Sequence, residues 1–254
     1  CLKTSASSRS AMTRSSISMR RFWRSIIPPK RKARGVWYTP EPVVNFIVRA
    51  VDDVLKSEFG LADGSADTSK ITVDWDTGQT EKGKPVTTKK EIHRVQILDP
   101  AAGTGTFLAE VIKQIAPKVK DVAPGQWSKY VETELIPRLH GFELLMASYA
   151  MCHMKLDMML TQMGYKPTGA NAPRLGVYLT NSLEESHPDA GTLFSHWLSD
   201  EANAANQIKK DAPVMVVLGN PPYSGISTNK SEWITNLIED YKYVDGEHFG
   251  ERKH

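Results

Sequence analysis

This 254-residue sequence has little cysteine, no long apolar run and, over its first forty residues, no acidic side chain. Its two cysteines, Cys1 and Cys152, lie far apart, which excludes a disulfide framework and paired-cysteine zinc spacing. We therefore expect a reducing, cytoplasmic setting and no metal site. No apolar stretch approaches the roughly 20 residues of a membrane-spanning helix, and none is typical of a secretory signal, so we expect no membrane partner.

Positive charge is concentrated at the start of the chain. Residues 1–40 contain ten Lys and Arg and no Asp or Glu; without them, 22 basic residues face 29 acidic ones, a net charge of −7 for 41–254. We interpret residues 1–33 as a basic, Ser/Arg-rich, disordered leader; a nucleic-acid-binding arm and an organelle transit peptide are the alternatives. The acidic remainder cannot hold a DNA duplex by net charge alone, so a local patch or a further region is needed for that.

Residues 34–254 predict an α/β domain. Apolar residues recur at helical spacing from Val43 to Leu55, after Thr39-Pro40, where we expect Thr39 to cap the helix and proline to occupy its first turn. Residues 60–90 are typical of a loop or an exposed hairpin around 71–75. Short apolar runs then alternate with helical patterns, which favours a doubly wound, mostly parallel sheet. The expected strands are 95–98, 139–142, 177–179 and 214–218, and the expected helices are 107–115, 146–163 and 193–209.

The first motif follows the first of these strands and reads ILDPAAGTGTFL over residues 97–108. Its small residues let a ligand approach the backbone closely, at the sheet edge where ligands bind. The third glycine of a dinucleotide fingerprint is replaced by Leu108, and no Gly-Lys-Ser/Thr phosphate loop is present. Asp99 before the turn suits a cationic ligand such as a methionine ammonium, whereas a helix N-terminus alone prefers an anion. A strand-to-helix turn with a capping aspartate is the alternative.

The second motif is the tetrad Asn220-Pro221-Pro222-Tyr223, in which two prolines end an apolar strand and hold its backbone rigid. The exocyclic amine of a base is a poor nucleophile because its lone pair is delocalised into the ring. The Oδ1 atom of Asn220 and the carbonyl of Pro221 can accept its N–H groups and offset the positive charge of the transition state. Tyr223 offers a face on which a flipped base stacks. A proline-terminated loop with a packed tyrosine is the alternative.

In this order the two motifs resemble those of class-γ N6-adenine DNA methyltransferases, and the neighbouring residues are similar to the methyltransferase part of type ISP restriction–modification enzymes. The resemblance covers about Arg34 to the last residue. It implies a Rossmann-like S-adenosylmethionine-dependent methyltransferase fold and methyl transfer to a flipped adenine in double-stranded DNA. It also implies that the parent chain includes nuclease and helicase parts.

The resemblance assigns roles to individual residues. The motif around Tyr38 closes over the methionine end of the cofactor, Glu143 ends the second strand where the ribose hydroxyls bind, and Asn181 follows the third strand where adenine is recognised. The implied cofactor-binding residues are Tyr38, Thr39, Pro40, Asp99, Ala101, Gly103, Gly105, Phe107, Glu143, Asn181 and Leu183. The implied catalytic residues are Asn220, Pro221, Pro222 and Tyr223.

Some of these roles have simpler alternatives. Glu143 lies 44 residues after Asp99, beyond the usual spacing of about 20, so it is either a helix-start acid or the ribose ligand after an insertion. Asn181 could cap the next turn, and Tyr38 could be a core aromatic residue. No acid–base step needs the histidines, so we expect His140 and His153 to pack.

The resemblance also sets an expectation about completeness. A sheet of this kind has seven strands and the sequence yields four, so we expect 34–254 to be the N-terminal and central part of the catalytic domain. That domain would be C-terminally incomplete, without a target-recognition domain and inactive alone. Asn-Pro-Pro-Tyr also occurs in glutamine-amide and RNA methyltransferases, and a non-catalytic cofactor-binding fragment is a third reading. The Tyr38-Thr39-Pro40 motif ahead of an Asp-Pro cofactor turn favours DNA.

Overall fold

A computed structural model describes residues 39–81, 84–169, 172–183, 201–206, 208–209, 212–222, 232–244 and 247–248. The chain divides into two compact units, one of Thr39–Asn220 with Asn229–His254 and one of Cys1–Tyr38 with Pro221–Thr228. In the second unit the described residues are Pro221 and Pro222, both exposed. The predicted leader, Tyr38 and Tyr223 lie outside the described residues.

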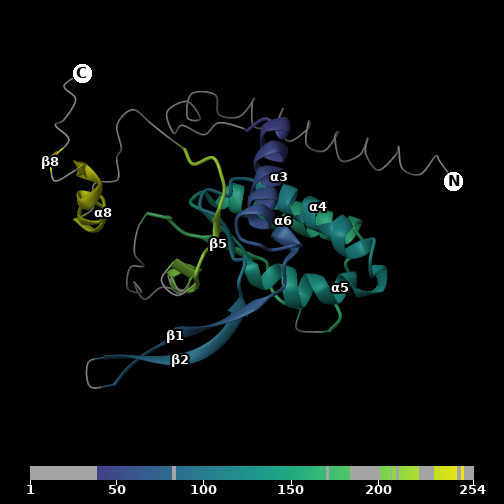
Figure 1. The fold of residues 1–254 in the computed structure, drawn as a ribbon, viewed down its shortest axis with the longest axis horizontal. Coiled ribbons are helices and arrows are strands. Elements are labelled where there is room, and N and C mark those ends of the chain that lie inside the picture. Colours follow the sequence, from purple (N-terminus) through teal and green to yellow (C-terminus); the bar gives the residue numbers. More distant parts are fainter. Residues whose placement is uncertain are drawn as a thin grey trace. The chain divides into compact units, whose positions relative to one another are not determined.

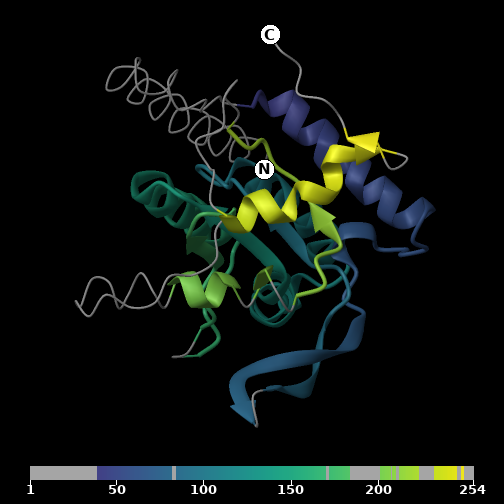
Figure 2. The same cartoon turned by 90° about the vertical axis from the view of Figure 1, so that its left-hand side faces the viewer.

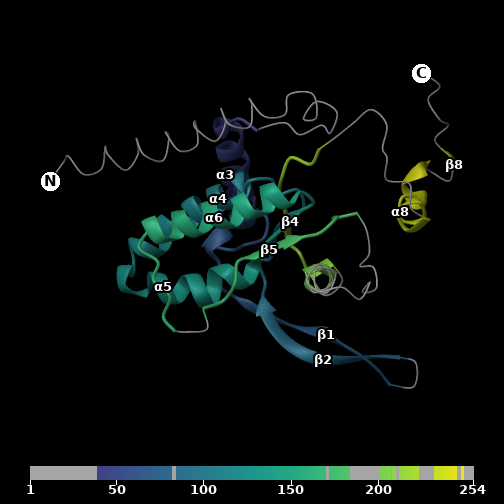
Figure 3. The same cartoon turned by 180° about the vertical axis from the view of Figure 1, so that it is seen from behind.

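Four short strands form one parallel sheet in the order β5-β4-β3-β6. They are β3 (Ile97–Asp99), β4 (Leu139–Glu143), β5 (Gly176–Leu179) and β6 (Val216–Val217); β4 and β5 lie side by side in Figure 3. Each coincides with one of the apolar runs, so the predicted parallel sheet is confirmed. The chain moves from β3 to β4 and β5, and then returns to place β6 on the other side of β3. Such a reversal marks the position where open α/β sheets bind ligands, at the carboxyl ends of the strands.

Helices α3 (Glu41–Ser57), α4 (Thr106–Lys120) and α6 (Met146–Gln162) confirm three predicted helices. Helix α4 links β3 to β4 and α6 links β4 to β5, and α4 contacts both α3 and α6 (Figure 1). Helical residues 201–206 and 208–209 fall within the predicted helix 193–209, whose remainder lies outside the described residues. The buried core residues of α4 and α6 include Leu108, Ile112, Ile115, Cys152, Leu156 and Leu160.

Short elements complete the described fold. They are η1 (Gly64–Ala66), η2 (Pro124–Gln126), α5 (Trp127–Tyr130), η3 (Val131–Leu135), η4 (Ile136–Arg138), α8 (Glu232–Leu237), η5 (Glu239–Lys242), β7 (Tyr243–Val244) and β8 (Glu247–His248). In the part of the chain that the structure describes, no helix is long and apolar enough to cross a membrane.

The exposed hairpin expected around 71–75 is present and is longer than the sequence indicated. Strand β1 (Lys70–Glu81) pairs antiparallel with β2 (Lys84–His93) and forms a separate twisted ribbon (Figure 2). The Nζ atom of Lys90 lies 3.7 Å from the centroid of the Trp75 ring, a cation–π contact between the two strands. The hairpin therefore has its own sheet, apart from the one that carries the two motifs.

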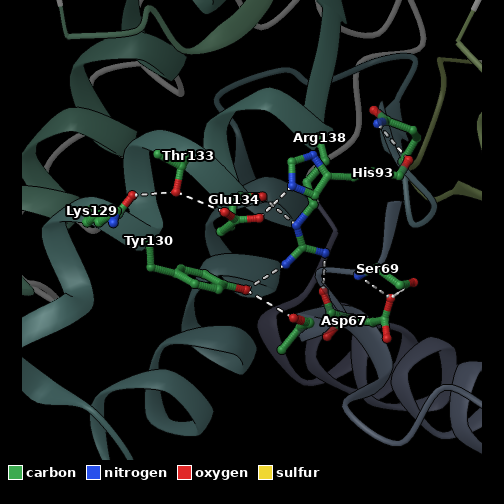
Figure 4. Close-up of polar contacts among 11 residues, drawn as sticks. Asp67, Ser69, His93, Lys129, Tyr130, Thr133, Glu134 and Arg138 are labelled. Carbon is green, nitrogen blue, oxygen red and sulfur yellow. Dashed lines mark hydrogen bonds and ion pairs between the residues drawn. The ribbon is translucent and has the colours of Figure 1, made fainter. Parts of the chain in front are cut away.

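A buried arginine joins the beginning of β4 to the segment after α3 (Figure 4). The Arg138 side chain is fully buried, and its Nη1 donates to the carbonyl of Ser65 at 2.6 Å. Its Nη2 donates to the Tyr130 hydroxyl at 2.7 Å, and its Nε donates to the carbonyl of Glu134 at 2.7 Å. A buried charge is tolerated when its donors are satisfied in this way, so this cluster fixes β4 relative to η1.

The start of α3 differs from the prediction. Pro40 occupies the N-cap position, no side chain caps the helix, and Pro42 lies in the first turn. The backbone N–H groups of Val43 and Val44 donate to the carbonyl of Pro40. The expectation that Thr39 caps α3 is therefore wrong, and its hydroxyl is available for another contact.

Candidate cofactor and catalytic site

The glycine turn after β3 is tied to the end of β4. The N–H of Ala102 donates to the carbonyl of Phe142 at 2.8 Å, and the N–H of Gly103 donates to Oε2 of Glu143 at 2.7 Å. The other oxygen of Glu143 accepts from the N–H of Leu145, the N-cap residue of α6, at 2.7 Å. Burial raises the pKa of this carboxyl group. Glu143 therefore acts as a helix-start acid and also holds the turn, and its carboxylate keeps acceptor capacity beyond the backbone donors of Gly103, Leu144 and Leu145.

Asp99 lies at the end of β3, almost fully buried. Its Oδ1 accepts from the N–H of Ala101 at 3.1 Å, while its Oδ2 has no hydrogen-bond partner among the described residues. Burial raises the pKa of Asp99 to about 7, and the nearby charge of Glu143 acts in the same direction. A buried carboxylate with an unpartnered oxygen is costly, and a cation beside it would remove that cost.

The end of β6 packs directly against Asp99. The N–H of Leu218 donates to the carbonyl of Leu98 at 3.0 Å, which continues the pairing of β6 with β3. A Cβ atom at Gly219 would lie 2.5 Å from Oδ1 of Asp99, far closer than real Cβ atoms approach. A side chain at position 219 would therefore displace the carboxylate of Asp99, and this close approach places Asn220 one residue from the contact with Asp99.

Two glycines of the turn have left-handed backbone angles. Gly103 has φ 55° and Gly105 has φ 73°, a region that residues with a Cβ rarely adopt. A Cβ at Gly105 would also lie 2.6 Å from Sγ of Cys152, whose thiol pKa is raised to about 12 by burial. Phe107, predicted as a cofactor residue, is buried in the core below the turn.

The segment after β5 reaches the same turn. Ser182 donates its hydroxyl to the carbonyl of Pro100, and Oδ1 of Asn181 accepts from the N–H of Leu183 at 3.1 Å. The turn-capping alternative for Asn181 is therefore observed, and among the described residues its amide N–H₂ makes no hydrogen bond. Leu183 is exposed.

An ion pair covers the outer edge of β5. Arg174 donates through Nη2 to the carbonyl of Val177 at 2.8 Å, and its Nη1 lies 2.5 Å from Oε1 of Glu201. Oε2 of the same carboxylate accepts from the N–H of Leu179 at 3.2 Å. The outward-facing backbone groups of this edge strand are thereby satisfied by side chains, which holds the strand end in place.

Asn220 follows β6 and is exposed, and its Nδ2 donates to Oγ1 of Thr39 at 3.0 Å. Thr39 is half-buried and Pro40 is exposed. The predicted catalytic residue and the predicted methionine-end motif are therefore in contact, although 181 positions separate them.

The two histidines pack as expected. The Nε2 atom of His140 lies 2.7 Å from Oε1 of Gln96, and burial lowers the pKa of His140 to about 4. The Nε2 atom of His153 lies 3.1 Å from the carbonyl of Val177. Both rings therefore make hydrogen bonds within the fold, away from the glycine turn.

The model of the DNA-methyltransferase domain of MmeI matches residues 76–245, which include the glycine turn, the ends of all four strands and the tetrad. This chain belongs to that family. No curated protein sequence matches it.

Three solved structures are similar to the chain. The type ISP restriction–modification enzyme LlaBIII bound to DNA is 24% identical over 76% of this chain, with a TM-score of 0.52. A nuclease-deletion mutant of the type ISP enzyme LlaGI, in complex with a DNA substrate mimic, is 25% identical over 77%, with a TM-score of 0.50. A DrdV–DNA complex is 25% identical over 86%, with a TM-score of 0.54. The chain spans 11%, 13% and 18% of these three chains, respectively. The predicted resemblance to the methyltransferase part of type ISP enzymes is confirmed.

The structure brings most of the predicted residues to one edge of the sheet and adds some that the sequence did not indicate. Gly219 and Ser182 lie beside predicted residues, and glycine before the tetrad was a usable signal. Glu201 comes from a helix with no motif, so nothing in the sequence pointed to its contact with β5. Of the predicted residues, Tyr38 and Tyr223 lie outside the described residues, and Pro221 and Pro222 belong to the other compact unit.

Proposed function

We propose that this chain is the cofactor-binding and catalytic part of an S-adenosylmethionine-dependent adenine-N6 DNA methyltransferase, within a restriction–modification system. The observation that carries the proposal is the close approach of Gly219 to Asp99. Because Gly219 directly precedes Asn220, this approach brings the start of the tetrad beside the proposed cofactor turn. The Rossmann-like order of strands, with its reversal beside β3, supports the same reading.

The described residues fit this cofactor. The unpartnered Oδ2 of Asp99 suits the methionine ammonium, and two buried carboxyl groups with raised pKa favour a ligand that carries positive charge. Glu143 has lone pairs left for the ribose hydroxyls, and the amide N–H₂ of Asn181 suits a ring nitrogen of adenine. Thr39 and Pro40 are proposed to contact the methionine end of the cofactor.

The acceptor site rests on Asn220 and the residues that follow it. Oδ1 of Asn220 and the carbonyl of Pro221 accept the N–H groups of the adenine amine, and Tyr223 stacks on the flipped base. When bound, S-adenosylmethionine supplies a methyl carbon whose bond to a positively charged sulfur breaks as the amine nitrogen attacks. The amine then loses its proton to solvent, so the packed histidines take no part. Much of the rate comes from positioning.

Substitution of Asn220 tests the assignment. In the full-length enzyme that contains this chain, we expect Asn220→Ala to lower methyl transfer about 10²–10³-fold, the typical effect of removing one transition-state hydrogen bond. Cofactor affinity, measured by calorimetry, should stay within about threefold, because the glycine turn is untouched. Loss of transfer and cofactor binding together would contradict the catalytic role.

The acceptor is tested separately with labelled cofactor. Tritium should pass from S-adenosylmethionine to duplex DNA, and digestion of the product to nucleosides should release N6-methyl-2′-deoxyadenosine. A glutamine-containing release-factor peptide and a single-stranded RNA serve as alternative acceptors. Label on either of these, with none on the duplex, would refute the DNA assignment.

The parent chain is proposed to bind duplex DNA and to include nuclease and helicase parts. Two of the similar structures are type ISP enzymes in complex with DNA or a DNA substrate mimic, which supports DNA binding by the parent chain. One of them is a nuclease-deletion mutant, which supports a nuclease part in enzymes of that kind.

A further inference from the structure

We propose that Thr39 is a positioning residue, which holds the side-chain amide of Asn220 with its oxygen toward the acceptor amine. The inference rests on the proposed function and gives Thr39 a role beyond the cofactor. Its basis is the hydrogen bond from Nδ2 of Asn220 to Oγ1 of Thr39, at 3.0 Å. Within the described part of the chain, neither side chain makes another hydrogen bond.

The hydrogen bond matters because an asparagine side chain has two ends of similar size and opposite chemistry. Oδ1 can accept an N–H group of the acceptor amine, whereas Nδ2 in the same place would set donor against donor. In the structure Nδ2 is the end engaged by Thr39, so Oδ1 of Asn220 is the end left for the amine. Because a hydroxyl can also donate, Thr39 stabilises this orientation together with the amine that Oδ1 accepts. A carboxylate at this position would need no such control, because its two oxygens are equivalent.

The hydroxyl of Thr39 is free for this task because it does not cap a helix. Helix α3 begins at Glu41 after Pro40, without a side-chain cap, so Thr39 lies one residue before the cap position. The helix itself is anchored by Val44, Val48 and Leu55, each at most 2% exposed. The hydroxyl therefore lies two residues before a helix that is firmly packed against the core, which suits a positioning group.

A double-mutant cycle in the full-length enzyme tests the role. Thr39→Val removes the hydroxyl at nearly constant volume, and we expect it to lower kcat for adenine methylation about three- to tenfold, the worth of one hydrogen bond. Thr39→Ser, which keeps the hydroxyl, should restore most of that loss. In an Asn220→Asp background, Thr39→Val should change kcat less than about twofold, because a carboxylate has no wrong orientation.

An equal loss of kcat in the wild-type and Asn220→Asp backgrounds would overturn the inference, since Thr39 would then act without orienting the amide. Cofactor dissociation constants, measured by calorimetry for each variant, separate this effect from a contact with the cofactor. A wild-type enzyme that transfers no methyl group to adenine contradicts the proposed function. A wild-type enzyme that methylates adenine but shows an additive cycle contradicts only the role of Thr39.

A binding measurement covers the case in which Asn220→Asp does not turn over. The enzyme is titrated with two duplexes of its own methylation site, one with adenine and one with purine, which lacks the amine, at the target position. We expect Thr39→Val to reduce the preference for adenine about three- to tenfold and Thr39→Ser to restore it. An unchanged preference in Thr39→Val would refute the inference.

Discussion

Two aspartates in this chain are equally buried and have opposite surroundings. Asp52, on α3, and Asp99, at the end of β3, are each 1% exposed. Oδ1 of Asp52 accepts from the hydroxyl of Ser65 at 2.6 Å and from Nζ of Lys118 at 2.6 Å, and its Oδ2 lies 2.7 Å from Nζ of Lys56. Asp99 has a single backbone donor to Oδ1 and no partner for Oδ2 among the described residues.

The pKa values of the two carboxyl groups diverge accordingly. The lysine and serine partners hold the pKa of Asp52 well below its usual range even though burial opposes them, while burial raises the pKa of Asp99 to about 7. Each aspartate also abuts a glycine whose Cβ would lie 2.5 Å from its Oδ1: Gly64 beside Asp52 and Gly219 beside Asp99. The comparison teaches that burial alone does not reveal function. A buried carboxylate paired with two lysines stabilises the fold, whereas one that forms no ion pair among the described residues is suited to a cationic ligand.

The largest effect on stability is expected from removing Asp52. Asp52→Ala leaves the ammonium of Lys118 and the hydroxyl of Ser65 without their acceptor, and should cost about 2–4 kcal/mol, somewhat below the usual loss for a buried pair because both lysines are partly exposed. Native-state hydrogen exchange of α3 in the full-length enzyme measures the change in opening free energy. Unchanged protection of α3 would show that the two aspartates do not differ as argued.

The two aspartates should make opposite contributions to the pH dependence of the free energy of unfolding, which is the next largest effect. The folded pKa of Asp99 is raised, so its contribution is complete below about pH 4 and is lost as the pH rises through about 7. The contribution of Asp52, whose pKa is lowered, is present above about pH 4 and is lost as the pH falls.

Asp99→Asn removes the carboxylate charge that makes the protein less stable as the pH rises through about 7. Relative to wild type, we expect this variant to gain on the order of 1–3 kcal/mol in the opening free energy of β3 and β4 at about pH 8 and little at about pH 4, while binding cofactor at least about tenfold more weakly. Hydrogen exchange at both pH values and calorimetry measure these quantities. A variant that is less stable than wild type at the higher pH would refute the assignment of Asp99 as an incompletely partnered carboxylate.

The smallest effects should come from the two glycines. Gly219→Ala forces a methyl group against Asp99. If the backbone after β6 shifts, the cost should be about 1–2 kcal/mol of local stability; if the carboxylate of Asp99 shifts, cofactor binding should weaken about tenfold. Gly64→Ala should destabilise α3 by somewhat more without changing cofactor affinity, because its Cβ would also lie 2.9 Å from the backbone oxygen of Asp52 and its φ of 56° adds strain. Gly125→Ala is the matched control, because nothing lies within 4 Å of its Cβ position and its φ is ordinary. Equal cofactor affinities in Gly219→Ala and Gly125→Ala would argue against a ligand beside Asp99.

Much of the fold could be predicted from the sequence because its signals are local. The apolar runs at β3, β4, β5 and β6 and the periodic pattern of α3 correspond directly to elements of the structure. The capping role of Thr39 was wrong because the helix begins one residue later than expected, with Pro40 at the N-cap position. The partner that the Thr39 hydroxyl has instead, Asn220, is 181 positions away, and no local rule predicts it.

The sequence by itself determined the order of the two motifs, the residue types that suit a cationic cofactor and an amine acceptor, and the glycines at which the turn needs left-handed angles. Tertiary structure decided the rest. It brought Gly219 against Asp99, linked Ser182 to Pro100 over 82 positions and directed the amide of Asn220 to Thr39. Distant segments meet only after the sheet has formed, and whether a buried oxygen lacks a partner depends on every group packed around it. That is why the sequence indicates the chemistry of Asp99, whereas its unpartnered oxygen is a property of the fold.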